Sequence, residues 1–205
     1  MVPAVCFVLM LVTGDQHGHI WLIWQRFPIL LAITVIPLAS VPGGVRGQLV
    51  TAGLVALALA STASACVHWV RFQRDDVGDF DAALRVMSPR KRVTGLIFDK
   101  VSSVVYRHPL VHFVSYYQLD KGGVVEFTFA GYPHWPYTFR HDRLPPEGAP
   151  TRLNWEWTPE LVTTAELYPY FDYVLTRGDG WTPTPGTFHL AWTGQRWKVW
   201  QRDSD

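Results

Sequence analysis

The side chains best suited to holding a ligand form two pairs in one short segment of the chain. His112 and Tyr116 are four residues apart, and so are Tyr117 and Lys121. On a helix, residues four apart lie on the same face. A lysine ammonium supplies three donors, and tyrosine hydroxyls both donate and accept, so together they can hold a phosphate or the hydroxyls of a sugar. The segment therefore carries four candidate ligand-binding residues.

The same segment also has a purely structural interpretation. A helix here can pack Phe113, Tyr116 and Tyr117 into a core, and aromatic side chains dominate the energetics of burial. Lys121 is then solvated near the C-terminus of the helix, where the helix dipole favours a positive charge. This interpretation is the simpler one, because it requires no ligand.

A second candidate is the loop over residues 132–137, which contains two prolines, two tyrosines, His134 and Trp135. Aromatic faces suit the apolar faces of sugars, and long loops often carry function. The alternative is a loop that covers a small core or lies at a membrane interface. The predicted ligand-binding residues are therefore His112, Tyr116, Tyr117, Lys121, His134 and Trp135.

No catalytic or cofactor motif accompanies these residues. The sequence has no phosphate-binding loop, no glycine-rich dinucleotide fingerprint after a strand and no recognisable order of Ser, His and Asp. His17 and His19 stand near Asp15, but no third metal ligand is identifiable, and a polar interfacial loop explains them better. We predict no cofactor and no metal site, and we assign no catalytic residue.

Charge divides the chain into two unlike parts. The first 70 residues hold only three of the 35 formally charged side chains, namely Asp15, Arg26 and Arg46. The uncharged windows over 27–45 and 47–70 are close to the roughly 20 apolar residues that a membrane-spanning helix needs. We therefore predict a transmembrane region over 1–70 and a soluble domain over 71–205. The predicted spans cover about 1–14 in part, 20–42 and 47–70.

The third predicted span is rich in alanine, serine and glycine. Small residues let helix backbones approach closely, so this helix is expected to contact other transmembrane helices as well as the lipid bilayer. From Arg71 onward the chain carries 16 basic and 16 acidic residues. That balance leaves no electrostatic footprint for nucleic acid, which is excluded as a partner.

The soluble part alternates helix and strand patterns. Helices are predicted over about 75–87, 109–119 and 158–167, strands over 92–98, 124–129 and 171–176, and a hairpin over 188–192 and 196–200. Helices that connect strands favour right-handed crossovers and parallel pairing. The predicted fold class is therefore α-helical transmembrane segments followed by a small α/β domain, with about three mainly parallel strands and a C-terminal β-hairpin.

Several features of the soluble part have a familiar order. A strand that ends at Asp99 is followed by aromatic and histidine residues over 106–117, by Lys121 with two glycines, and by a strand over 171–178 before the hairpin. From about Ile20 onward the chain resembles the C-terminal region of large, uncharacterised bacterial multi-spanning proteins. Their plan is similar to that of glycosyltransferases of the GT-C class, which use polyprenyl-phosphate sugars.

The resemblance implies a location in the bacterial inner membrane, with the C-terminal domain on the extracytoplasmic side. Counting arginines near the spans gives the opposite side, with Arg26, Arg71 and Arg74 flanking the domain and only Arg46 flanking the turn. We follow the resemblance here. It carries over no catalytic residue, because the acidic motif of such enzymes has no counterpart in this sequence. We expect the chain to be the C-terminal piece of a larger protein.

Two functions remain open at this point. In the first, the chain is the C-terminal part of a membrane glycosyltransferase-like protein, and its soluble domain helps to bind a glycan or a lipid-linked sugar. In the second, it is a non-catalytic, membrane-anchored interaction module. Independent catalysis by these 205 residues is not expected. The sequence predicts neither the substrate nor the reaction.

Overall fold

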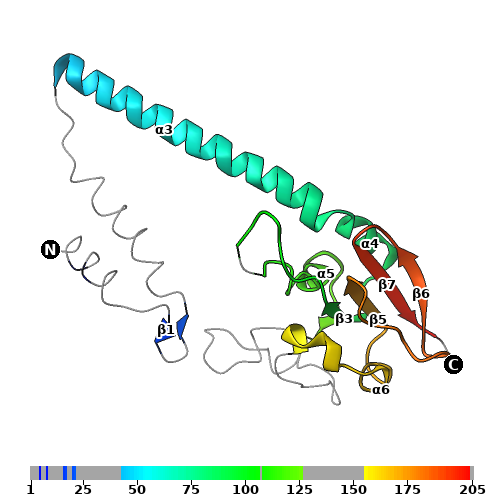
Figure 1. The fold of residues 1–205 in the computed structure, drawn as a ribbon. Coiled ribbons are helices and arrows are strands. Elements are labelled where there is room, and N and C mark those ends of the chain that lie inside the picture. Colours follow the sequence, from blue (N-terminus) through cyan, green and yellow to red (C-terminus); the bar gives the residue numbers. More distant parts are fainter. Residues whose placement is uncertain are drawn as a thin grey trace. The chain divides into compact units, whose positions relative to one another are not determined.

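The computed structural model describes residues 5, 8, 16–17, 20–21, 43–106, 108–126 and 155–203 (Figure 1). The chain divides into two compact units, Met1–Thr62 and Ala63–Asp205. In the first unit, β1 (Gln16–His17) and β2 (Ile20–Trp21) pair antiparallel. The span predicted over 20–42 therefore does not begin as a helix at Ile20. The rest of that span, and most of the span predicted over 1–14, fall outside the described residues.

The longest element is the helix α3 (Gly44–Arg71), which has 28 residues. At 1.5 Å per residue such a helix is about 42 Å long, more than the hydrocarbon thickness of a bilayer. Its leucine and valine side chains are exposed along its length, and among its residues only Gly47 is buried. Within the described residues, the helical run over 44–77 is the one segment long and apolar enough to cross a membrane.

The helix does not stop where its apolar part ends. It continues as a π-helical turn, η3 (Phe72–Val77), and then breaks at Gly78 before α4 (Phe80–Val86) begins. Gly78 has a φ of 60°, which glycine adopts without the steric penalty that other residues incur. The sequence predicts a single helix over 75–87. The break at Gly78 explains why the structure instead has η3 and α4 in this region.

The second unit is built on one five-stranded mixed sheet. Its strands are β3 (Arg92–Ile97), β4 (Val124–Val125), β5 (Tyr173–Arg177), β6 (Phe188–Thr193) and β7 (Trp197–Arg202), in the spatial order β4-β3-β5-β7-β6. β3 runs parallel to β4 and β5, whereas β7 runs antiparallel to β5 and β6. The prediction of about three mainly parallel strands is not matched, because the hairpin joins this sheet instead of standing apart from it.

Both faces of the sheet are covered. Alternate residues of β3 separate the two sides: Val93 and Ile97 pack against α4 and the segment before α5, whereas Leu96 packs against Leu167 and Phe171. Buried strands of this kind read as nearly continuous apolar runs. Gly95 lies between Val93 and Ile97 on β3. A side chain would clash at this position, because an added Cβ would stand 2.9 Å from the Cβ of Val114. The glycine thus lets the segment before α5 approach the sheet closely.

The remaining helices are short. They are α5 (Ser115–Lys121), η6 (Trp155–Trp157), η7 (Pro159–Leu161) and α6 (Thr164–Leu167). The helix predicted from Pro109 begins only at Ser115. Before it, the backbone turns tightly, with hydrogen bonds between residues three apart, as from the Phe113 amide to the Leu110 carbonyl at 3.1 Å. The α5 helix ends at Gly122, whose φ is 69°.

Candidate functional site

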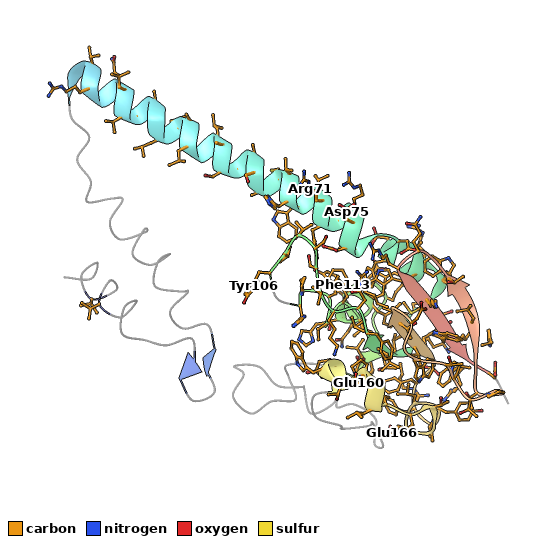
Figure 2. All side chains as sticks on the ribbon, viewed as in Figure 1. Arg71, Asp75, Tyr106, Phe113, Glu160 and Glu166 are labelled. Atoms are coloured by element: carbon orange, nitrogen blue, oxygen red, sulfur yellow. The ribbon has the colours of Figure 1, made fainter. Side chains whose placement is uncertain are left out.

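A groove of about 630 Å³ lies within the second unit, between the end of the long helical run and α5. Five aromatic residues line it, which we call the aromatic wall: Trp69, Phe72, Phe80, Phe113 and Tyr116. Val77, Leu84 and Leu119 add apolar surface, and Gln73, Asp81, Arg85 and Asp120 supply polar groups, which we call the polar rim. Figure 2 shows the side chains of this region, with Arg71, Asp75 and Phe113 labelled.

The aromatic wall is a continuous series of ring contacts. The ring centroids of Trp69 and Phe72 are 5.8 Å apart, those of Phe72 and Phe113 6.4 Å, and those of Phe113 and Tyr116 5.2 Å. Phe80 lies 5.2 Å from Phe113 and 6.1 Å from Tyr116. Edge-to-face pairs at these distances are favourable, so each ring helps to fix its neighbour. The wall is therefore formed before any ligand arrives.

The wall is closed at its floor and open at its two ends. Phe72 and Phe80 are buried, whereas Trp69 is 66% exposed and Tyr116 is 51% exposed. Leu119, on the same side as Tyr116, is also exposed. Large apolar side chains that remain exposed around a concave surface are a common mark of a binding site. This groove is therefore the best candidate functional site among the described residues.

Local sequence explains how the wall is positioned. Trp69 and Phe72 lie three residues apart on the end of the helical run, and Phe80 begins α4 directly after the break at Gly78. Phe113 and Tyr116 are also three residues apart, where the Tyr116 amide donates to the Phe113 carbonyl at 3.0 Å. Residues three apart on a helical turn share a face. Two helical segments thus present aromatic residues to one another.

The structure separates the predicted ligand-binding residues. Tyr116 lines the groove, whereas Tyr117 is fully buried on the core side. The Tyr117 hydroxyl donates to the Ser88 carbonyl at 2.6 Å and accepts from the Lys91 amide at 2.9 Å. Burial raises the pKa of this hydroxyl. The position of Tyr117 is that of a core residue.

The other predicted residues do not gather around the groove in the described part of the chain. His112 is partly buried, and burial lowers the pKa of its imidazole. Lys121 lies at the end of α5, with its Nζ 4.0 Å from a carboxylate oxygen of Asp120, which does line the groove. His112 and Tyr116 do not share one α-helix, because α5 starts at Ser115. His134 and Trp135 fall outside the described residues.

Sequence reasoning missed three residues of the aromatic wall. Trp69 falls in the span predicted over 47–70, Phe72 in the predicted soluble domain over 71–205, and Phe80 in the helix predicted over about 75–87. One feature of the sequence could have indicated Trp69. Tryptophan favours the membrane interface, where one part of its side chain meets lipid and the other meets water. The pairing of Phe72 and Phe80 with Phe113 depends on tertiary packing, so no local pattern shows it.

A second cluster lies at the carboxyl ends of β3 and β5, where open α/β sheets usually bind ligands. Arg177 is 1% exposed, and its guanidinium donates to the Asp76 carbonyl at 2.6 Å and to the Asp99 carbonyl at 3.0 Å. It also lies 3.2 Å from the Asp99 carboxylate and 5.4 Å from the ring centroid of Trp197. The protein's own η3 segment therefore contacts these strand ends. We call this cluster the arginine clamp.

The carboxylate of Asp76 completes this arrangement. It is buried and accepts from the hydroxyl of Ser102 at 2.6 Å and from the amide of Ser103 at 3.3 Å. The indole of Trp197 donates to the Val77 carbonyl at 2.7 Å. These bonds satisfy polar groups inside the unit, as buried polar groups require. The role of the cluster is to hold η3, and with it one wall of the groove, against the sheet.

A buried carboxyl group stands elsewhere, beside the edge strand β4. Glu126 accepts from the Gly95 amide at 2.9 Å. Burial, opposed by that hydrogen bond and reinforced by the charge of Glu156, raises the pKa of Glu126 to about 8. The carboxyl group is therefore protonated at neutral pH. It does not line the groove.

Among the described residues, no three His, Cys, Asp or Glu side chains come together as a metal site would require. The groove offers aromatic surface and hydrogen-bonding groups, which suit binding more than bond cleavage. Comparison of the chain with known protein families, with curated proteins and with solved structures found no match.

Proposed function

We propose that this chain is the membrane-anchored C-terminal part of a glycosyltransferase-like protein, in which the unit over 63–205 assists the binding of a lipid-linked sugar or glycan. The observation that carries the proposal is the groove that starts at Trp69, in the last turn of the long apolar helix. A ligand there would be reached directly from the interface between the bilayer and water.

The position of the groove along the helix supports an amphiphilic ligand. Trp69 is two residues before Arg71, where the apolar helix ends, and one helical turn rises about 5.4 Å. Tryptophan and arginine at a helix end are typical of the interfacial layer of a membrane. Lipid-linked sugars present their polar part in this layer, so the groove lies at the depth where such a molecule changes from chain to headgroup.

The size of the groove supports a small ligand over a protein partner. About 630 Å³ falls within the range of small-molecule sites, which is about 300–1,000 Å³. A stable protein–protein contact usually buries more than about 1,000 Å² in total, and the groove alone does not offer such a surface. The interaction module therefore stays the second candidate. It is favoured by the exposed apolar side chains of α3, which other transmembrane helices can cover.

The membrane side belongs to the same proposal. The resemblance to extracytoplasmic C-terminal domains of multi-spanning bacterial proteins supports an inner-membrane location with the second unit outside. Fusing a periplasm-dependent phosphatase to Asp205 should give an active enzyme, whereas a fluorescent protein that folds only in the cytoplasm should stay dark. The reverse result would place the second unit in the cytoplasm. It would not test ligand binding, which the next experiment measures.

The binding proposal is tested with the full chain in phosphatidylcholine nanodiscs that contain a small fraction of a polyprenyl-phosphate hexose. Native mass spectrometry of the released protein should show this lipid retained in preference to phosphatidylcholine. The Tyr116→Ala variant should retain less of it, and Tyr106→Ala should behave as the natural chain. Equal retention of both lipids by the natural chain would contradict the proposal.

A further inference from the structure

We propose that the unit over 63–205 rests on the bilayer surface through one apolar edge, made of Trp69, Tyr116 and Leu119. The open side of the groove then faces the headgroup layer of the membrane that α3 enters, and not water or a second protein. This contact rests on the membrane anchoring in the proposed function, but it does not depend on which ligand the groove binds. Three exposed apolar side chains that line one groove carry the proposal.

The apolar edge begins on the helix. Trp69 is exposed and stands between Val67 and Val70 in the sequence, which are exposed as well. Tryptophan at the end of an apolar helix is typical of the membrane interface. Phe72 follows after a rise of about 4.5 Å, and the headgroup layer is roughly 5–8 Å thick on each side of a bilayer. The floor of the groove at Phe72 therefore lies at headgroup depth.

The apolar edge continues on α5. Tyr116 and Leu119 are three residues apart, so they share one face of this helix. Leu119 is 81% exposed and Tyr116 is half exposed, whereas Tyr117 between them is fully buried. A single exposed leucine is ordinary on a protein surface. Two large exposed side chains beside an exposed tryptophan form a patch, which marks a site of interaction with a protein or a membrane.

The groove joins the two parts of the apolar edge. Ring contacts of the aromatic wall run from Trp69 to Tyr116, and no step between ring centroids is longer than 6.4 Å. Phe72 and Phe113 in the middle of this series fix α5 beside the end of the helical run. A bilayer that receives Trp69 therefore meets Tyr116 and Leu119 on the same side of the unit.

Charge around the groove is balanced. Asp81 and Asp120 are matched by Arg85 and by Lys121, whose Nζ lies 4.0 Å from a carboxylate oxygen of Asp120. The formal charge of these four side chains is zero. A contact made by a basic patch requires anionic lipid and is screened by salt. The contact proposed here depends on apolar burial, so it should form on neutral lipid and persist in high salt.

The test measures the depth of a nitroxide at position 119 in the full chain. Cys6 and Cys66 are replaced by serine, Leu119→Cys is labelled, and the chain is reconstituted in phosphatidylcholine nanodiscs. Electron paramagnetic resonance compares collisions with oxygen, which is enriched in lipid, with collisions with a water-soluble nickel complex. The oxygen-to-nickel ratio should be at least about threefold higher than at a site in water, because interfacial side chains are buried by about 5–10 Å.

Two labelled sites serve as matched controls. Leu161→Cys is the control in water, because Leu161 is 56% exposed on η7 and its neighbour Val162 packs on the sheet face opposite the aromatic wall. Figure 2 shows Glu160, which precedes Leu161, well apart from Arg71 at the helix end. Val67→Cys is the control in lipid, because Val67 is half exposed on α3. The ratio at position 119 should lie between those of the two controls.

The outcomes separate this contact from the proposed function. A ratio at position 119 equal to that at position 161 would overturn the contact with the bilayer. Few collisions with either reagent would show that a protein covers the apolar edge, which would overturn it as well. Loss of the high ratio in concentrated salt would show a contact made by charge and not by apolar burial.

The two remaining results concern the proposed function itself. A ratio at position 67 as low as that at position 161 would show that α3 is not in the membrane, and the proposed anchoring would fail together with the contact. Failure to retain polyprenyl-phosphate hexose, with a high ratio at position 119, would overturn the proposed ligand and leave the bilayer contact standing.

Discussion

Adjacent tyrosines in α5 have opposite roles. Tyr116 lies at the groove with half of its surface exposed, and Tyr117 is buried and bonded to the backbone at Ser88 and Lys91. A single position along the helix thus separates a candidate ligand contact from a core residue. Burial and hydrogen bonding, and not residue type, make the difference.

This difference predicts the behaviour of two conservative variants. Tyr117→Phe removes one acceptor and one donor from a buried site and should lower the free energy of unfolding by about 1–3 kcal/mol. Tyr116→Phe is the matched control and should change it by less than about 0.5 kcal/mol, because the side chain is half exposed. Near-ultraviolet circular dichroism during thermal melting of the detergent-solubilised chain measures both. Equal destabilisation by the two variants would contradict the structure.

A second prediction concerns Glu126. The pKa of this carboxyl is about 8 in the folded chain, and an unfolded glutamate titrates near 4.5. Below pH 4.5 both states are protonated, and the contribution of Glu126 to stability is fully present. As the pH rises toward 8, the unfolded state releases its proton first, so this contribution is lost.

Glu126→Gln removes this loss. The glutamine can still accept from the Gly95 amide, and it carries no charge at any pH. The variant should match the natural chain near pH 4.5 and be more stable at pH 8, by an amount of the order of a few kcal/mol. Melting temperatures measured at both pH values provide the check. A difference that does not change with pH would show that the carboxyl is not the titrating group.

The sequence predicted each tyrosine in a separate ligand-binding pair, Tyr116 with His112 and Tyr117 with Lys121, on a helix that starts at Pro109. A helix from that point would put His112 and Tyr116 on one face. The observed backbone turns more tightly before Ser115, where α5 begins. His112 and Tyr116 therefore do not lie on one face of a single α-helix. Proline permits a helix start without requiring one, and for that reason the local sequence could not settle which tyrosine faces outward.

At the scale of elements, the arginine clamp determines where the groove can exist. Arg177 ties η3 to the ends of β3 and β5, and η3 carries Phe72 of the aromatic wall. The usual ligand crevice of an α/β sheet is thereby taken by the protein itself, and the groove is lined by other residues of η3, namely Phe72, Gln73 and Val77.

Removing the clamp should therefore loosen the unit. Arg177→Met keeps part of the packing on Trp197 but leaves the buried carbonyl of Asp76 and the partly buried carbonyl of Asp99 without this donor. It should lower the free energy of unfolding by about 2–3 kcal/mol. The loss is smaller than for a fully buried ion pair because the Asp99 side chain is 41% exposed. Amide hydrogen exchange over 72–77 should also accelerate.

Arg74→Met is the matched control for the clamp. Arg74 pairs with Asp75 at 2.7 Å, but this pair is solvent-exposed, and exposed ion pairs contribute little. Its loss should leave both melting and exchange unchanged. If Arg177→Met behaved like the control, the guanidinium would not be holding η3.

The order of elements in the second unit was largely predictable, and their pairing was less so. The apolar run over 92–98 and the hairpin near Gly194 appear as β3 and as β6–β7. The hairpin's attachment to β5 is a contact between distant residues, such as Val174 with Trp200, and no periodicity encodes it. The tail of the strand predicted over 124–129 falls outside the described residues.

For the whole molecule, the charge asymmetry was the most informative sequence feature. It predicted a membrane part followed by a soluble part, and the described residues contain α3 as a helix able to cross a bilayer. Carbonate extraction of the expressed chain should leave it in the membrane pellet, because α3 exposes its apolar side chains along its length. Recovery in the supernatant would contradict membrane insertion.

The edge strand β6 has one irregularity with a wider consequence. Leu190 pairs with Trp200 and Trp192 with Val199, so Ala191 is an extra residue that bulges from the ladder. The free side of an edge strand is a template on which another chain can add, and a bulge twists that template away. Molecules held in one membrane plane meet at high local concentration. The bulge at Ala191 therefore makes β6 a poorer template for the addition of a strand from a second molecule.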